Sequence, residues 1–127
     1  MEKSISELAK DVYNARTNPG MLSDVHITLA TIFANMNEQM METQLEKADF
    51  WQVKDFEQDE TGKLDEYEGC LTKREKPLSD TAVEMMWLQT EAGKKEIKLK
   101  YTLRSLEKLM QACKSSMVNS AIEAKNI

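Results

Sequence analysis

The last third of the chain decides the fold: residues 81–124 read TAVEMMWLQTEAGKKEIKLKYTLRSLEKLMQACKSSMVNSAIEA. This stretch contains no proline and a single glycine, Gly93, so little in it interrupts a helix. Apolar side chains recur at spacings of three and four residues, apart from a gap at Lys95 and Glu96, as in a coiled-coil seam. The pattern predicts one helix over about residues 80–124, on the order of 60 Å long.

The composition of the whole chain favours the same fold class. Of 127 residues, 41% are hydrophobic and 31% charged, and only four are glycine and two proline. A turn-rich sandwich, a barrel or a glycine-rich nucleotide loop needs more of both residue types. We therefore expect an all-α protein, a single helical domain over residues 1–127 in which three helices include one very long C-terminal helix.

Two helices are predicted before the long one. Ser4 and Glu7 form a capping-box pattern, and helically spaced apolar residues follow, which predicts a first helix over about residues 4–16. The sequence Asn18-Pro19-Gly20 ends it. A second helix is expected over about residues 22–53, capped by Ser23 or Asp24.

An acidic connector over residues 55–77 separates the second helix from the third. Residues 55–69 contain seven acidic side chains and one lysine, a composition that predicts a mobile segment. A calcium loop beginning at Asp55 would place ligands at alternate positions, but no glycine occupies its sixth position. We therefore expect no metal site.

The net charge of −5 conceals two regions of opposite sign. Residues 81–127 carry eight basic and five acidic side chains, so they amount to +3 and the first 80 residues to −8. Cations beside an aromatic ring suit single-stranded nucleic acid, because cations follow the phosphates and a ring stacks on a base. Alternatively, these lysines form an ordinary solvated face and pair with Glu91, Glu96 and Glu107. The candidate nucleic-acid-binding residues are Lys94, Lys95, Lys98, Lys100, Tyr101, Arg104 and Lys108.

The first half of the long helix is apolar on two arcs, which two shorter helices can hardly cover. We therefore predict a homo-oligomer, with Trp87 between subunits or against the second helix. Alternatively, Trp87 belongs to the core of the single chain. The candidate interface residues are Met86, Trp87, Leu99, Leu103, Leu106, Met110 and Met117.

No catalytic or cofactor motif is recognisable. The single histidine, His26, has no serine or cysteine partner at a recognisable spacing, and there is no phosphate-binding loop, so we expect a non-enzyme without a cofactor. Cys70 and Cys113 have no metal-ligand spacing and are expected to be reduced. Without a membrane span or a signal peptide, a cytoplasmic location is expected.

The order of these elements resembles the UvsY-type recombination mediator proteins of phages, mainly over residues 76–120. The similar segments are Ser79-Asp80 followed by Trp87, Thr90-Glu91, Lys95-Glu96-Ile97 and Leu106-Glu107-Lys108-Leu109. The resemblance implies a ring-like homo-oligomer that binds single-stranded DNA, cooperates with a recombinase and helps to displace a single-strand-binding protein. It implies phosphate contacts from Lys94, Lys95, Lys98 and Arg104, and subunit contacts along residues 99–117.

Two other functions fit the sequence. An acidic helical protein of a mobile element could inhibit a host defence or nucleic-acid enzyme by offering carboxylates to a basic cleft. The residues for that surface are Asp59, Glu60, Asp65 and Glu66. In the other alternative, a coiled-coil assembly or scaffold protein, the helices only make contacts and neither charged region has a dedicated ligand.

Overall fold

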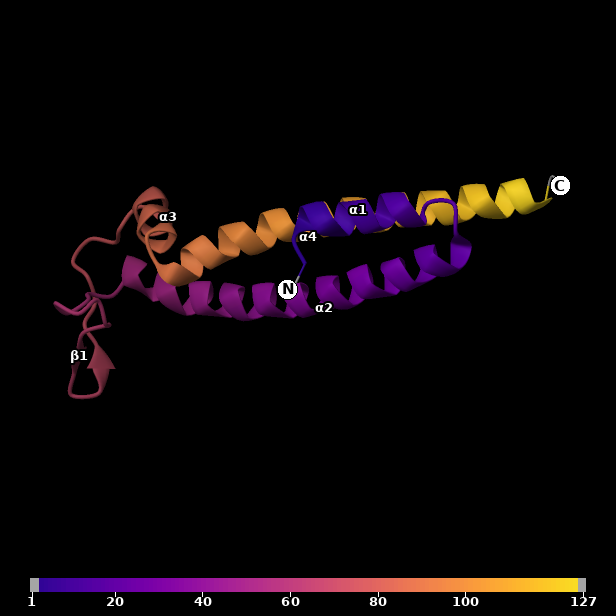
Figure 1. Cartoon of the computed structure of the whole chain (residues 1–127). Coiled ribbons are helices and arrows are strands. Elements are labelled where there is room, and N and C mark those ends of the chain that lie inside the picture. Colours follow the sequence, from indigo (N-terminus) through magenta and orange to yellow (C-terminus); the bar gives the residue numbers. More distant parts are fainter. Residues whose placement is uncertain (1–2, 126–127) are drawn as a thin grey trace. The chain divides into compact units, whose positions relative to one another are not determined.

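The computed structural model describes residues 3–125, with side chains up to Asn119, and it is mostly helical (Figure 1). Its elements, in chain order, are α1 (Ile5–Ala15), α2 (Pro19–Phe50), the 3₁₀ helix η1 (Trp51–Lys54), β1 (Glu66–Tyr67), β2 (Cys70–Leu71), α3 (Asp80–Leu88) and α4 (Glu91–Lys125). The described chain divides into two compact units. We call residues 3–40 with 98–125 the helical unit, and residues 41–97 the hairpin unit.

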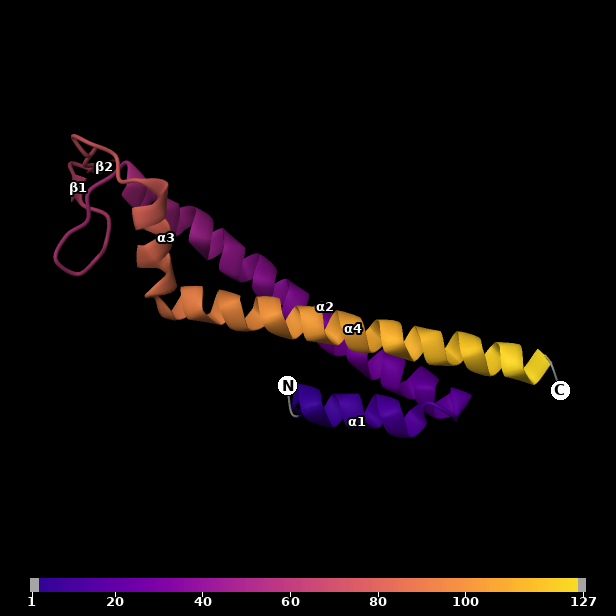
Figure 2. The same cartoon turned by 90° about the horizontal axis from the view of Figure 1, so that it is seen from above.

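Three helices form the core of the helical unit: α1, the first part of α2 and the latter part of α4 (Figures 1 and 2). Each contributes a stripe of apolar side chains at helical spacing, as the sequence predicts. The buried members are Leu8, Val12, Ala15, Leu22, Leu29, Leu106 and Cys113. Burial removes the Cys113 thiol from water and raises its pKa, so this cysteine acts as a small apolar side chain.

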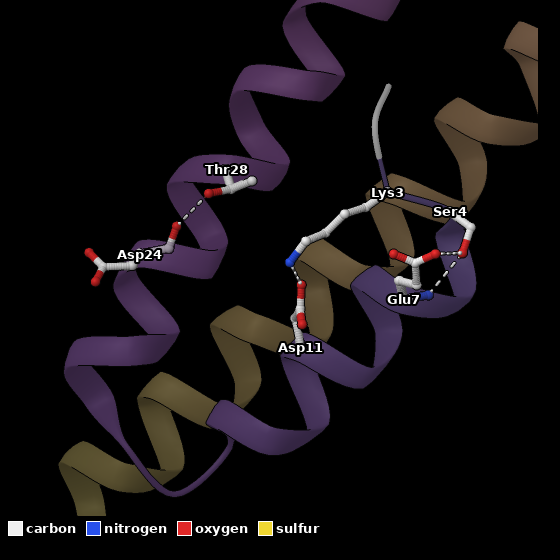
Figure 3. Close-up of polar contacts among 6 residues, drawn as sticks. All are labelled: Lys3, Ser4, Glu7, Asp11, Asp24 and Thr28. Carbon is white, nitrogen blue, oxygen red and sulfur yellow. Dashed lines mark hydrogen bonds and ion pairs between the residues drawn. The ribbon is translucent and has the colours of Figure 1, made fainter.

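Local polar contacts fix the start of α1 (Figure 3). The Ser4 hydroxyl oxygen accepts a hydrogen bond from the Glu7 amide at 3.2 Å, which confirms the predicted N-cap. The Glu7 carboxylate accepts from the Ser4 hydroxyl at 3.3 Å instead of bonding a backbone amide. Lys3 adds an ion pair with Asp11 at 2.7 Å across two turns.

The second helix begins earlier than the sequence predicts. Pro19 is its first residue, because the first turn needs no amide donor and the fixed φ of proline suits it. The Asn18 side chain, rather than Ser23 or Asp24, accepts from the Met21 amide at 3.1 Å. The helix ends at Phe50, where η1 tightens the following turn.

In the hairpin unit, Trp87 is the largest fully buried side chain. It is 2% exposed, and its ring centroid lies 5.4 Å from that of Phe50. The indole Nε1 donates to the Glu96 carboxylate at 3.3 Å, so the polar end of the ring has a partner. Lys47 joins this cluster through ion pairs with Glu84 at 3.0 Å and with Glu96 at 3.5 Å.

The prediction of one helix over residues 80–124 is wrong, because α3 and α4 are separate helices. The Thr90 hydroxyl donates to the Trp87 carbonyl at 2.6 Å and accepts from the Gly93 amide at 2.9 Å, which caps α4 at the corner. The Trp87 carbonyl comes so close to Gly93 that an added Cβ there would lie 2.0 Å from its oxygen. Four helices therefore replace the predicted three, and Gly93 makes the sharp corner possible.

The predicted mobile connector contains ordered structure. β1 and β2 pair antiparallel, Glu66 with Leu71 and Tyr67 with Cys70. The two residues between the strands, Glu68 and Gly69, have φ values of 53° and 80°, as in a type I′ hairpin turn. Strand pairing therefore orders part of this segment despite the acidic composition that predicts a mobile one.

We predict that Gly93→Ala destabilises the protein by about 3 kcal/mol, because the new methyl group collides with backbone that the corner holds in place. Chemical denaturation followed by far-UV circular dichroism measures the loss. Gly20→Ala is the matched control, because a Cβ there meets only the Asn18 side chain at 3.5 Å, an ordinary contact. Equal stability of the two variants would contradict the role assigned to Gly93.

Candidate nucleic-acid interface

The predicted basic residues of the helical unit are exposed along α4. The inner side of this helix faces the core with Leu106 and Cys113, both fully buried. At about 100° per residue, the cations fall on other arcs than this seam. Their side chains are all exposed: Lys98, Lys100, Arg104 and Lys108. Lys94 and Lys95, also exposed, belong to the hairpin unit. We call Lys98, Lys100, Tyr101, Arg104 and Lys108 the basic face.

The cations of the basic face have no ion pairs with carboxylates among the described side chains. Lys94 forms the predicted helical pair with Glu91, at 3.6 Å. Glu96 is drawn instead to Lys47 and Trp87. Among the side chains that the structure describes, no ion pair within 4.0 Å involves Lys98, Lys100, Arg104 or Lys108. The predicted pairing with Glu91 is thus confirmed for Lys94, and the four cations of the basic face are exposed to solvent without a carboxylate partner among the described side chains.

Tyr101 gives the basic face an exposed aromatic ring. Its side chain is 62% exposed, and the Arg104 guanidinium lies 5.9 Å from the ring centroid. This cation–π contact stabilises both side chains by about 0.5–1 kcal/mol at an exposed site. The free side of the ring remains open to a stacking partner.

A shallow pocket of about 260 Å³ lies within the helical unit beside this face. Phe33 and Met110 contribute apolar walls, and Glu107, Gln111 and Lys114 complete the lining. Glu107, the one acidic residue of this stretch of α4, has no ion pair among the described side chains. The basic face therefore borders a concavity lined by Phe33 of α2 and by Met110 and three polar side chains of α4.

Several predicted interface residues lie inside the chain. Trp87 is buried within the hairpin unit, which confirms the alternative that places it in the core of the single chain. Leu99 and Leu106 are buried, and Met110 and Met117 pack against the core of the helical unit. Met86 and Leu103 are half-buried. The apolar seam of α4 is satisfied by α1 and α2, so it has little surface left for a second subunit.

The four connector residues predicted to form an acidic partner surface have different surroundings. Glu60 and Glu66 are exposed, and Asp65 is half-buried. The carboxylate of Asp59 accepts hydrogen bonds from the Thr61 hydroxyl at 2.6 Å and from the amides of Thr61 and Lys63. These bonds, chiefly that from the Thr61 hydroxyl, hold the pKa of Asp59 below its ordinary value. Asp59 thus organises its own loop.

The described residues include the histidine and both cysteines of the chain. They contain no group of three histidine, cysteine or acidic side chains able to hold a metal ion. The Nε2 atom of His26 is buried and has no hydrogen-bond partner among them. Both cysteines are free thiols, Cys70 exposed and Cys113 buried. No helix within residues 3–125 has the length and apolar character needed to cross a membrane.

Comparisons of the chain with protein-family models, with curated proteins and with solved structures gave no match.

We predict that Asp59→Ala loosens the loop, whereas Asp59→Asn largely preserves it, because asparagine keeps an acceptor oxygen for the three donors. NMR chemical shifts of the Thr61 and Lys63 amides report the difference.

In the wild-type protein the same amides should shift as the pH falls through the lowered pKa of Asp59. Protonation weakens the acceptor, so the stabilisation of the loop by Asp59 is lost as the pH falls through that pKa. Identical spectra for the alanine variant and the wild type would show that Asp59 does not organise the loop.

Proposed function

We propose that the protein is a non-enzymatic accessory factor of DNA recombination that binds single-stranded DNA through the basic face of α4. The observation that carries the proposal is a set of four exposed cations without carboxylate partners among the described side chains, three of them in one row, beside an exposed tyrosine ring. Single-stranded DNA offers phosphates for the cations and unpaired bases for the ring.

The spacing of the cations supports this ligand. Lys100, Arg104 and Lys108 follow one another at four-residue intervals, so they form a row along the helix with about 6 Å between neighbours. Backbone phosphates of an extended single strand are separated by a similar distance, and flexible side chains absorb the mismatch. A ligand bound in this way is held by charge and stacking, without readout of its base sequence.

The resemblance to UvsY-type mediators supports the biological context of the proposal: a homo-oligomer that works with a recombinase on DNA coated by a single-strand-binding protein. An acidic half suits such a role, because repulsion between it and DNA confines the strand to the basic face. Lys94 and Lys95 extend the cation series toward the start of α4.

Binding of a labelled single-stranded oligonucleotide, measured by fluorescence anisotropy, should weaken steeply with salt. Four phosphate contacts predict a slope of log K against log salt concentration of about −2.8, or about 50-fold weaker binding at 200 mM than at 50 mM salt. Lys100→Ala with Lys108→Ala should halve this slope. Lys10→Ala with Lys73→Ala is the matched control, because it removes two exposed charges that do not belong to the basic face. Absence of binding at low salt, or binding indifferent to salt, would refute the proposal.

Stacking is tested separately from charge. Tyr101→Ala should weaken binding by about 5-fold to 150-fold, the loss expected for one base–aromatic stack, with no change in the salt slope. Tyr101→Phe keeps the ring and should bind like the wild type. Equal losses in both variants would show that the hydroxyl, and not the ring, makes the contact.

A further inference from the structure

A second charged surface lies on the outer side of α2 in the hairpin unit. Its centre is an apolar row at coiled-coil spacing, Met41, Leu45 and Ala48, all exposed. Met41 and Leu45 are 64% and 66% exposed. An acidic row runs beside it, about one carboxylate per turn: Glu42, Glu46 and Asp49. We call these six residues the acidic face.

The acidic face and the basic face each carry unneutralised charge. Among the described side chains, no ion pair involves Glu42, Glu46 or Asp49. The four cations of the basic face likewise form no ion pair among the described side chains. The two faces have opposite charge and a similar spacing of about one charge per helical turn.

We infer that the acidic face on α2 of one copy packs against the basic face on α4 of a second copy. Charges at matching intervals on two helices can pair along their length, and the apolar row adds burial that charge alone does not supply. Met41 and Leu45 would cover the Tyr101 ring and the aliphatic stems of Lys100 and Arg104. The proposed function includes a homo-oligomer, and this inference rests on that part of it and names the two surfaces through which the copies meet; it does not depend on DNA binding.

The second copy is the occupant that the charges select. Pairing of two acidic faces would set carboxylates against carboxylates, and pairing of two basic faces would set cations against cations, at a cost of several kcal/mol in either case. Only α2 against α4 brings opposite charges together. Because these are different surfaces, the contact is heterologous, and each copy retains one face of each sign for further copies in a ring or a filament.

Such a contact makes self-association and polyanion binding compete for the basic face. A single strand of DNA offers denser negative charge than three carboxylates, so it would displace α2 from the basic face. The acidic face then protects the basic face against other anionic partners until DNA is present.

The test is a charge exchange between two variants of the full chain, followed by analytical ultracentrifugation at about 25 mM and about 500 mM salt. Wild-type protein should associate at low salt and dissociate at high salt. Glu42→Lys with Glu46→Lys, and separately Lys100→Glu with Arg104→Glu, should each weaken self-association at least about tenfold. An equimolar mixture of the two variants should associate again, because the altered α2 of one then matches the altered α4 of the other.

Far-UV circular dichroism shows whether each variant is folded, and Glu42→Gln with Glu46→Gln provides a milder second pair of substitutions. A wild-type chain that remains monomeric at low salt would overturn the inference, and so would a mixture of folded variants that does not associate.

A DNA-binding measurement on the same variants distinguishes failure of this inference from failure of the proposed function. The α2 variant retains the basic face and should bind oligonucleotide at least as well as the wild type. If the variants associate only in the mixture and none of the proteins binds DNA, the proposed function alone fails.

Discussion

The structure depends on the burial of one side of α4. Leu106 and Cys113 are fully buried against α1 and α2, and a buried leucine contributes about 1.5–3 kcal/mol relative to an exposed one. A helix that commits one side to a core must present the other to solvent. Helical geometry places the four cations and Tyr101 off this seam, and their side chains are exposed. The core therefore determines where a charged ligand can bind.

The hairpin unit depends on a different constraint: the chain turns sharply between α3 and α4 while the indole of Trp87 stays buried. Trp87 satisfies its ring nitrogen through Glu96, and Glu96 in turn shares Lys47 with Glu84. Desolvation lowers the pKa of Lys47, but bonds to the two carboxylates outweigh it, and the net effect is a raised pKa. This cluster is thus stable while Lys47 is charged and weakens only as the pH rises through that raised value. Because the Glu96 carboxylate bonds Trp87 and Lys47, it does not pair with the lysines further along α4.

Helical periodicity was sufficient to predict most of the fold. It placed α1, the body of α2 and the buried stripe of α4, because apolar spacing reports directly on which side of a helix is covered. It missed the corner between α3 and α4, since Thr90 and Gly93 are tolerated inside a helix and only the approach of the Trp87 carbonyl shows their role. It also missed the hairpin, where the tight turn at Glu68 and Gly69 was hidden by the acidity around it. Both errors concern backbone geometry that side-chain hydropathy does not record.

The candidate site was partly accessible from the sequence. Lysine and arginine positions off the seam could be listed, but which of them remain unpaired depends on contacts distant in the chain, such as that of Lys47 with Glu96. The acidic face of α2 has a signal of its own, with glutamates four residues apart at Glu42 and Glu46 beside an apolar row. Its importance becomes visible only when Thr43 is buried and Met41 and Leu45 are exposed, because the sequence alone does not say which side of α2 faces inward. The opposite charges of the two regions therefore occupy defined surfaces. They lie in exposed rows along two helices, with a similar spacing, where another chain or a nucleic acid can reach them.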